Sequence, residues 1–196
     1  MICEYTDSYK FYKLKTVIGN RLSTDNSLGD NKSQNAVIVR TCLINGVKIL
    51  LLQIDSSHKM GTIGVTEGEK ITLSFEYATK KKLPVISVIA SGGIRIQEGT
   101  LALMQMVKMA AAVKKHSDKG LLYISIVTNP TLGGASASFV SLADIIIAEK
   151  DAVYGFSGRR IITDTTHEQL PNNFQTAEYA KQHGMVDIVA DKAEIK

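Results

Sequence analysis

A chain of 196 residues, 44% of them hydrophobic and 21% charged, has the composition of a globular protein and a length that suits one domain. The longest apolar run, residues 101–113, is interrupted by Gln105 and Lys108, so the chain offers no membrane-spanning segment. The net charge of +4 is small and the lysine clusters fall at expected helix ends, which argues against nucleic-acid binding.

Cysteine usage and the first residues predict the compartment. The N-terminus lacks a basic region followed by an apolar one, so no secretory signal is expected. The two cysteines, Cys3 and Cys42, are far apart and have no metal-ligand spacing. Free thiols are typical of a cytoplasmic protein, and we expect this location.

The first part of the chain is polar and mixed. We expect residues 1–35 to form an N-terminal arm or helix ahead of a domain that spans residues 36–196. Aromatic and apolar side chains within residues 5–14 predict a short helix packed on the domain, or an arm on a partner. Residues 25–33 have the composition of a loop.

Two apolar, β-branched runs, residues 36–44 and 47–54, predict a β-hairpin. They flank Asn45-Gly46. An Asn-Gly pair between two such runs is the strongest short hairpin signal, because both residues accept the positive φ angles of a tight turn. A glycine-containing loop, residues 59–64, follows.

Helices and strands alternate over the rest of the chain. The predicted elements are a helix from Glu67 to about Lys80, a strand at 83–89, a helix at 97–116, a strand at 122–127, a helix from Ala135, strands at 144–148 and 152–155, a helix at 176–183 and a strand at 185–189. This alternation defines an α/β protein in which two strands and a helix form the repeated unit. The helix at 97–116 is apolar nearly all round, which predicts burial in this chain or in an interface.

Two glycine pairs, Gly92-Gly93 and Gly133-Gly134, each stand between a predicted strand and a predicted helix. Glycine allows close approach to the backbone, and a helix start adds free N–H donors and a partial positive charge. Either pair alone is equally consistent with an ordinary tight turn. Two pairs in the same context favour an oxyanion hole, so we predict the backbone N–H groups of all four glycines as catalytic donors.

Several short segments contain uncommon combinations of residues and follow one another in a fixed order. They are residues 91–99, 122–125, 130–139, 155–160 and 183–187. Over roughly residues 36–190 they resemble the β subunit of bacterial acetyl-coenzyme A carboxylase carboxyltransferase. The resemblance implies a crotonase-like spiral of ββα units. It also implies carboxyl transfer from carboxybiotin, held on a biotin carrier protein, to acetyl-coenzyme A, with malonyl-coenzyme A as the product.

The same resemblance implies partners. An α subunit of the same fold would share the active site, commonly in an α2β2 assembly. Biotin and coenzyme A would then belong to the complex rather than to this chain alone.

Three positions depart from the family pattern. The family usually carries an N-terminal zinc ribbon with two CxxC pairs, which Cys3 and Cys42 cannot supply, so we predict no zinc. Met60 stands where the family usually has a glycine, and Arg159 where a proline is usual. These departures suggest a specialised paralogue with its own acceptor, or a non-catalytic partner.

Five residues are predicted to bind substrate: Gly61, Ser91, Arg95, Arg159 and Arg160. Arg95 would orient a phosphate or carboxylate, although an ion pair with Glu98 explains it on general grounds. The two consecutive arginines after Gly158 would meet coenzyme A phosphates, or form a solvated surface pair.

Two other functions stay open. The chain would be a free-standing crotonase-type acyl-coenzyme A hydratase, isomerase or decarboxylase if an acid or base side chain stood beside the predicted oxyanion hole. No obvious Glu follows Gly134. It would be a scaffold subunit if it kept the interface without the chemistry. A serine hydrolase has little support, because Ser136 and Ser138 have no His/Asp pattern around them.

Overall fold

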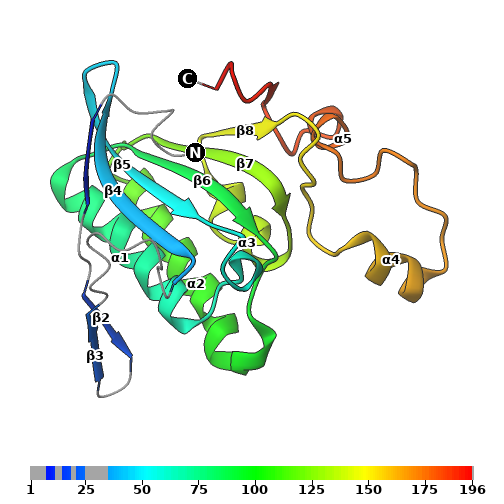
Figure 1. Ribbon diagram of the computed structural model, residues 1–196, viewed down its shortest axis with the longest axis horizontal. Helices are drawn as coiled ribbons and strands as arrows, with labels where there is room; N and C mark the ends of the chain where they lie inside the picture. The colour runs from blue at the N-terminus through cyan, green and yellow to red at the C-terminus, as the bar shows by residue number, and fades with distance from the viewer. Residues whose placement is uncertain (1–7, 12–14, 19–20, 25–34, 196) are drawn as a thin grey trace.

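The computed structural model describes residues 8–11, 15–18, 21–24 and 35–195, which are built around a mixed seven-stranded sheet (Figure 1). Its strand order is β1-β4-β5-β6-β7-β8-β9. The strands are β1 (Ser8–Phe11), β4 (Val37–Ile44), β5 (Val47–Ile54), β6 (Val85–Ser91), β7 (Tyr123–Thr131), β8 (Ile145–Glu149) and β9 (Ile188–Ala190). A separate two-stranded sheet pairs β2 (Lys15–Ile18) with β3 (Arg21–Thr24).

The predicted hairpin is confirmed. Strands β4 and β5 are antiparallel with Ile44 opposite Val47. The turn between them has φ angles of 48° at Asn45 and 77° at Gly46, the left-handed conformation that this residue pair tolerates.

The N-terminal segment departs from the prediction of a short helix. Residues 8–11 form strand β1, which pairs antiparallel with β4, so the helix is wrong for these residues. A free edge of β4 offers unpaired backbone groups, and a strand satisfies them as a helix would not. The expected loop at 25–33 lies outside the described residues, and the boundary between residues 35 and 36 stays a prediction.

Helical crossovers join the parallel strands β5 to β9. Helix α1 (Val65–Lys81) links β5 to β6, and α2 (Gly99–Ser117) links β6 to β7. The short α3 (Gly133–Ala137) and the 3-10 turn η4 (Val140–Leu142) precede β8, and α5 (Ala177–Gln182) precedes β9. Two further 3-10 turns are η2 (Lys59–Gly61) and η3 (Ile96–Glu98). This arrangement confirms the predicted α/β class.

The main core lies between the sheet and the pair α1 and α2, which lie on one face of it (Figure 1). Phe75 of α1 is fully buried and makes edge contacts with Tyr123 of β7 and with His116 of α2, at ring-centroid distances of 4.9 and 5.7 Å. The Tyr123 hydroxyl hydrogen-bonds Ser87 Oγ at 3.1 Å, which satisfies a polar group within this apolar layer.

Helix α2 is only half buried by its own chain. Ala102, Met109 and Val113 pack inward, whereas Leu101 and Val107 are 69% and 60% exposed. The apolar character all round this helix is therefore not explained by burial within this chain. No helix in the described ranges is long and apolar enough to cross a bilayer.

Two elements after β8 differ from the prediction. The expected strand at 152–155 is reduced to isolated bridges from Val153 to Thr176 and from Tyr154 to Thr131. Helix α4 (Arg159–Thr166), which was not predicted, lies on a segment that projects from the body (Figure 1). Nearly all of α4 is exposed and none of its residues is buried, so it lacks the core-facing stripe that identifies a helix in sequence.

Candidate active site

The first glycine corner follows strand β6. Ser91 is buried, and its hydroxyl donates to Gly61 O at 2.7 Å and accepts from Gly93 N at 3.1 Å. Gly92 N donates to Met60 O at 2.9 Å. These contacts fasten the corner to the loop at 59–64, so Ser91 has a structural part here, and its predicted contact with substrate is not supported.

Gly61 also serves this packing. It has a φ of 62°, and a Cβ at this position would lie 2.1 Å from Ala90 O. Only glycine permits that approach. Its buried backbone brings the loop onto β6, and the structure gives no reason to count it as a substrate contact.

The second glycine corner follows β7 and begins α3. Gly133 N donates to Phe156 O at 2.8 Å. The Ser136 hydroxyl donates to Gly133 O at 2.8 Å and to Gly155 O at 2.6 Å, and the Ser138 hydroxyl donates to Gly134 O at 2.5 Å. Both serines are thus committed to the backbone, in keeping with the absence of a serine-hydrolase pattern.

The two corners lie against each other. Leu132 N donates to Ser91 O at 2.9 Å. A Cβ on Gly93 would lie 3.2 Å from Gly133 Cα and 3.3 Å from Gly134 N. The predicted convergence of the corners therefore exists, and glycine makes it sterically feasible.

Three of the four predicted donors are already used within the chain. Gly92 N, Gly93 N and Gly133 N donate to Met60 O, Ser91 Oγ and Phe156 O, respectively. In this structure the same three N–H groups hold the corners in place, and their part as oxyanion donors stays a prediction. For Gly134 N, no acceptor is found among the residues that the structure describes, so its predicted part stands untested.

Two neighbouring N–H groups were missed by the sequence reasoning. Within the described ranges, neither Ile94 N nor Ala135 N has an acceptor. Ala135 lies in the first turn of α3, where N–H groups lack intrahelical partners. Ile94 lies beside Gly134, since a Cβ on Gly134 would be 2.2 Å from Ile94 Cγ1. Among the described residues, Ile94 N, Gly134 N and Ala135 N are thus N–H groups of the two corners without an acceptor.

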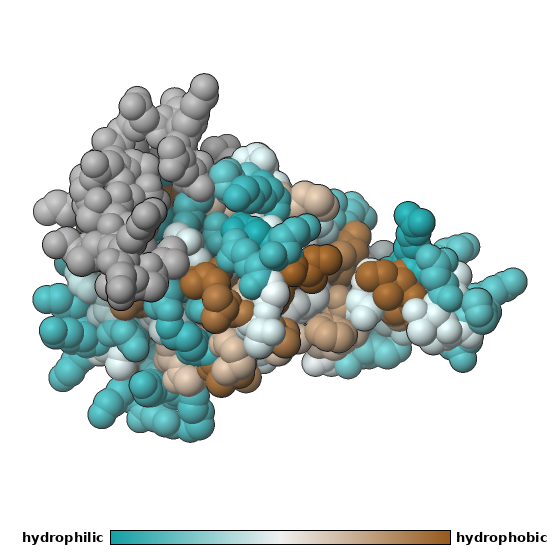
Figure 2. All heavy atoms as spheres, turned by 90° about the horizontal axis from the view of Figure 1, so that it is seen from below, coloured by the Kyte–Doolittle hydropathy of each residue, from teal (hydrophilic) through white to brown (hydrophobic). Residues whose placement is uncertain are grey.

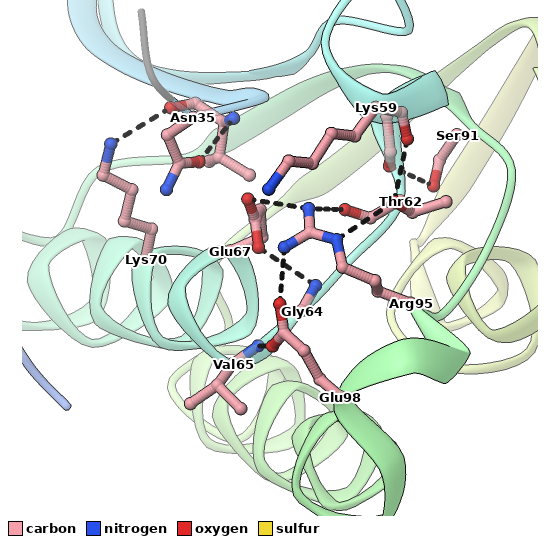
Figure 3. A network of polar contacts seen from close by, with 12 residues as sticks. Asn35, Lys59, Thr62, Gly64, Val65, Glu67, Lys70, Ser91, Arg95 and Glu98 are labelled. Atoms are coloured by element: carbon pink, nitrogen blue, oxygen red, sulfur yellow. Dashed lines mark hydrogen bonds and ion pairs between the residues drawn. The ribbon is translucent and has the colours of Figure 1, made fainter. Parts of the chain in front are cut away.

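Arg95 forms a network with two carboxylates (Figure 3). Its Nη1 donates to Glu98 Oε1 at 2.7 Å, and its Nη2 lies 3.0 Å from Glu67 Oε1. Burial by itself would lower the pKa of the guanidinium, but hydrogen bonds and charges from Glu67 and Glu98 outweigh burial and raise it. The ion pair with Glu98 is confirmed, and the prediction that Arg95 binds substrate is not supported.

The arginines of the projecting segment differ from each other. Arg159 donates to three carbonyl oxygens of its own segment, Leu170 O at 2.9 Å, Pro171 O at 2.5 Å and Asn172 O at 3.1 Å. Its guanidinium is thus occupied by backbone. Arg160 is exposed, with Nε 3.6 Å from Asp164 Oδ2, and its contact with substrate stays a prediction.

The described residues contain no group of three His, Cys, Asp or Glu side chains that could hold a metal ion. Cys42 is buried in the sheet, and Cys3 lies outside the described residues. The absence of zinc stays a prediction.

The mixed sheet, its helical crossovers and the two abutting strand–glycine–helix corners are those of an α/β protein, and similarity to solved carboxyltransferase structures gives its class as crotonase-like. The family model of the carboxyl transferase domain matches residues 6–194. The chain belongs to this family, and the predicted resemblance to its β subunits is confirmed.

Named relatives agree with the family. The chain is 47% identical over 190 residues to acetyl-coenzyme A carboxylase carboxyl transferase subunit beta 1 of Lachnospira eligens, covering 97% of this chain and 71% of the relative. It is 48% identical over 163 residues to subunit beta of Prochlorococcus marinus, covering 83% of this chain and 56% of that protein. The chain thus spans between about half and 71% of these relatives' lengths.

A solved structure supports the same fold. The transcarboxylase 12S structure with methylmalonyl-coenzyme A and methylmalonic acid bound has a TM-score of 0.80 and 26% identity. The match covers 98% of this chain and 38% of that one.

Proposed function

We propose that this chain transfers a carboxyl group from carboxybiotin, carried on a biotin carrier protein, to acetyl-coenzyme A, giving malonyl-coenzyme A. The contact between the corners at Gly93 and Gly133 is the observation that carries the proposal. A Cβ on Gly93, the residue before Ile94, would lie 3.3 Å from Gly134 N, so the N–H groups of Ile94 and Gly134 belong to adjoining corners at one end of the sheet. The names of the β-subunit relatives support acetyl-coenzyme A as the acceptor.

The donors fit an oxygen that gains negative charge. The proton that the methyl carbon of the acyl thioester loses would pass to the biotin nitrogen from which the carboxyl group departs, so the transfer requires no side-chain base. Charge then moves onto the thioester oxygen, and neutral N–H groups at a helix start stabilise it. One donor of this kind is worth roughly 3 kcal/mol of the barrier. Carboxybiotin, when bound, supplies the activated carboxyl group that the resulting carbon nucleophile takes up. The chain itself orients the thioester and holds the charge.

The alternative of a free-standing hydratase or isomerase is less well supported. Such chemistry needs an acid or base side chain at the corner. Glu67 and Glu98, the carboxylates next to the first corner, are both paired with Arg95 and with backbone N–H groups. For Glu98, burial by itself would raise the pKa, but the hydrogen bond from Val65 N and the contact with Arg95 lower it below the ordinary 4.5, so this carboxylate stays ionised at neutral pH.

We further propose that a second carboxyltransferase-type subunit, the α subunit, covers the exposed face of α2 in an α2β2 assembly. Leu101, Met104 and Val107 follow one another at helical spacing and are 69%, 51% and 60% exposed. Figure 2 views the side of the molecule on which α2 lies in Figure 1, and apolar patches interrupt its hydrophilic surface. Exposed apolar surface of this kind is typical of a subunit contact.

The decisive experiment is reconstitution. The chain is purified with a candidate α subunit and a biotin carrier protein charged with carboxybiotin, and malonyl-coenzyme A is measured. The proposal expects turnover by the complex and none by the isolated chain. Hydration of an enoyl thioester by the isolated chain would indicate the free-standing enzyme, and a stable complex without turnover would indicate a scaffold.

A further inference from the structure

The guanidinium of Arg95 is directed into its own chain. Arg95 is only 9% exposed. Its Nη2 donates to Thr62 O at 2.8 Å, and its Nε donates to Thr62 Oγ1 at 3.3 Å. Together with the carboxylates of Glu67 and Glu98, these acceptors occupy all three guanidinium nitrogens (Figure 3). A phosphate would have to displace them.

Each carboxylate joins the arginine to the start of α1. Glu67 pairs with Arg95 through Oε1 and accepts from Gly64 N through Oε2, at 3.0 Å. Glu98 pairs through Oε1 and accepts from Val65 N through Oε2, at 2.7 Å. One cation and the free N–H groups of a helix start therefore balance two anions.

Gly64 leaves the space that this network needs. A Cβ there would lie 2.4 Å from Glu98 Oε1 and 2.5 Å from Arg95 Nη1. A methyl group at this position would separate the ion pair without changing any charge. The chain thus offers two independent ways to break the same contact, one by removing the planar guanidinium and one by adding a steric obstruction at Gly64.

The network holds the loop at 59–64, which lies against the first glycine corner. Ile63 N donates to Gly93 O at 2.8 Å, and Arg95 N donates to Ile63 O at 2.8 Å. The loop contains consecutive left-handed residues, Lys59 and Met60, with φ angles of 48° and 56°. Non-glycine residues keep such angles only where surrounding contacts impose them.

We propose that Arg95 is a positioning residue for carboxyl transfer: by binding Thr62, Glu67 and Glu98 with one guanidinium, it fixes the loop at 59–64 and thereby the corner at Gly92-Gly93. It does not bind the thioester itself. The kinetic part of this inference rests on the proposed function, whereas the structural part does not.

The test compares Arg95→Lys and Gly64→Ala with the wild type in the reconstituted complex. Lysine keeps the charge but loses the planar fork, and the alanine obstructs the pair. Each variant should lower kcat about 100-fold, as small misplacements of reacting groups do. KM for the thioester should stay within about twofold, because substrate binding is untouched. Lys114→Met, which removes a cation from an exposed ion pair with Asp118, is the matched control and should change neither constant.

A second measurement does not depend on activity. Hydrogen exchange of Ile63 N–H and Gly92 N–H should be faster in both variants than in the wild type by about tenfold or more, since local opening becomes easier. Unchanged exchange would overturn the proposal whether or not the wild type transfers carboxyl groups. A raised KM with kcat retained would overturn it in favour of substrate binding by Arg95. If the wild-type complex does not transfer carboxyl groups but exchange is faster in both variants, the structural role of Arg95 is supported and only the proposed function is contradicted.

Discussion

Gly93 and Gly133, from two separate crossovers of the sheet, touch backbone to backbone. A Cβ on Gly93 would lie 3.2 Å from Gly133 Cα, and one on Gly133 would lie 3.3 Å from Gly93 Cα. Both residues also have left-handed φ angles, 104° and 62°. Conformation and contact therefore demand glycine at each position independently.

Gly93→Ala should separate the two corners. The new methyl group meets Leu132 O at 3.1 Å as well as Gly133, so backbone has to move. We expect a loss of transfer activity of about 100-fold, by displacement of the donor groups, and a loss of about 1–3 kcal/mol in the free energy of unfolding. Activity of the reconstituted complex and urea unfolding measure the two effects.

Gly120→Ala is the control for this substitution. Gly120 has a φ of 65° but nothing within 4 Å of an added Cβ. The backbone cost of about 1 kcal/mol should appear without loss of activity. Equal activity losses in the two variants would show that contact between the corners is unimportant.

Gly134→Ala should impair transfer through Ile94. The added Cβ would lie 2.2 Å from Ile94 Cγ1, so either the side chain or the α3 corner must shift. We expect a decrease in kcat of about 10²-fold if the corner shifts. The double variant Gly134→Ala/Ile94→Ala removes the clashing atom. Its kcat should fall less below that of Ile94→Ala than the kcat of Gly134→Ala falls below that of the wild type. Absence of any rescue would argue against this steric account.

Much of the fold was predictable because its signals are local. The hairpin at Asn45-Gly46, the helix from residue 65 and the two glycine corners each depend on residues close together in sequence. The use of the N–H groups was not predictable. Gly92 N and Gly133 N donate to Met60 O and Phe156 O, and those acceptors meet the corners only in the folded chain.

Only part of the network around Arg95 could be predicted from the sequence. Arg95 and Glu98 are three residues apart, a spacing that suggests an ion pair, and this pair was anticipated. Glu67 lies in the preceding helix, and nothing in sequence joins it to Arg95. The spacing of Gly64 and Glu67 is that of a helix start at which the Glu side chain accepts from the preceding backbone, a signal that would have placed the carboxylate near the corner.

Arg159→Ala should loosen the projecting segment without unfolding the domain. The guanidinium donates to three carbonyl oxygens at 170–172, and these lose a charged donor. The groups are exposed and water replaces the contact, so we expect a loss of less than about 1 kcal/mol in global stability. Limited proteolysis should cut residues 167–173 faster than in Arg160→Ala, whose ion pair at 3.6 Å is fully solvated. Equal cleavage of the two variants would contradict the bracing of the segment by Arg159.

His116 should make stability depend on pH. It is fully buried beside Phe75, and one ring nitrogen lies 2.9 Å from Thr79 Oγ1. Burial lowers its pKa below the ordinary 6.5, although Leu122 O and the charge of Asp144 act in the opposite direction. The unfolded chain therefore binds more protons than the folded chain below pH 6.5. The contribution of His116 to the free energy of unfolding should be fully present above that pH and decrease as the pH falls below it. His116→Phe, which keeps a ring against Phe75, should flatten this slope in urea unfolding followed from pH 7.5 down to about pH 5. A slope that survives the substitution would assign the pH dependence to other groups.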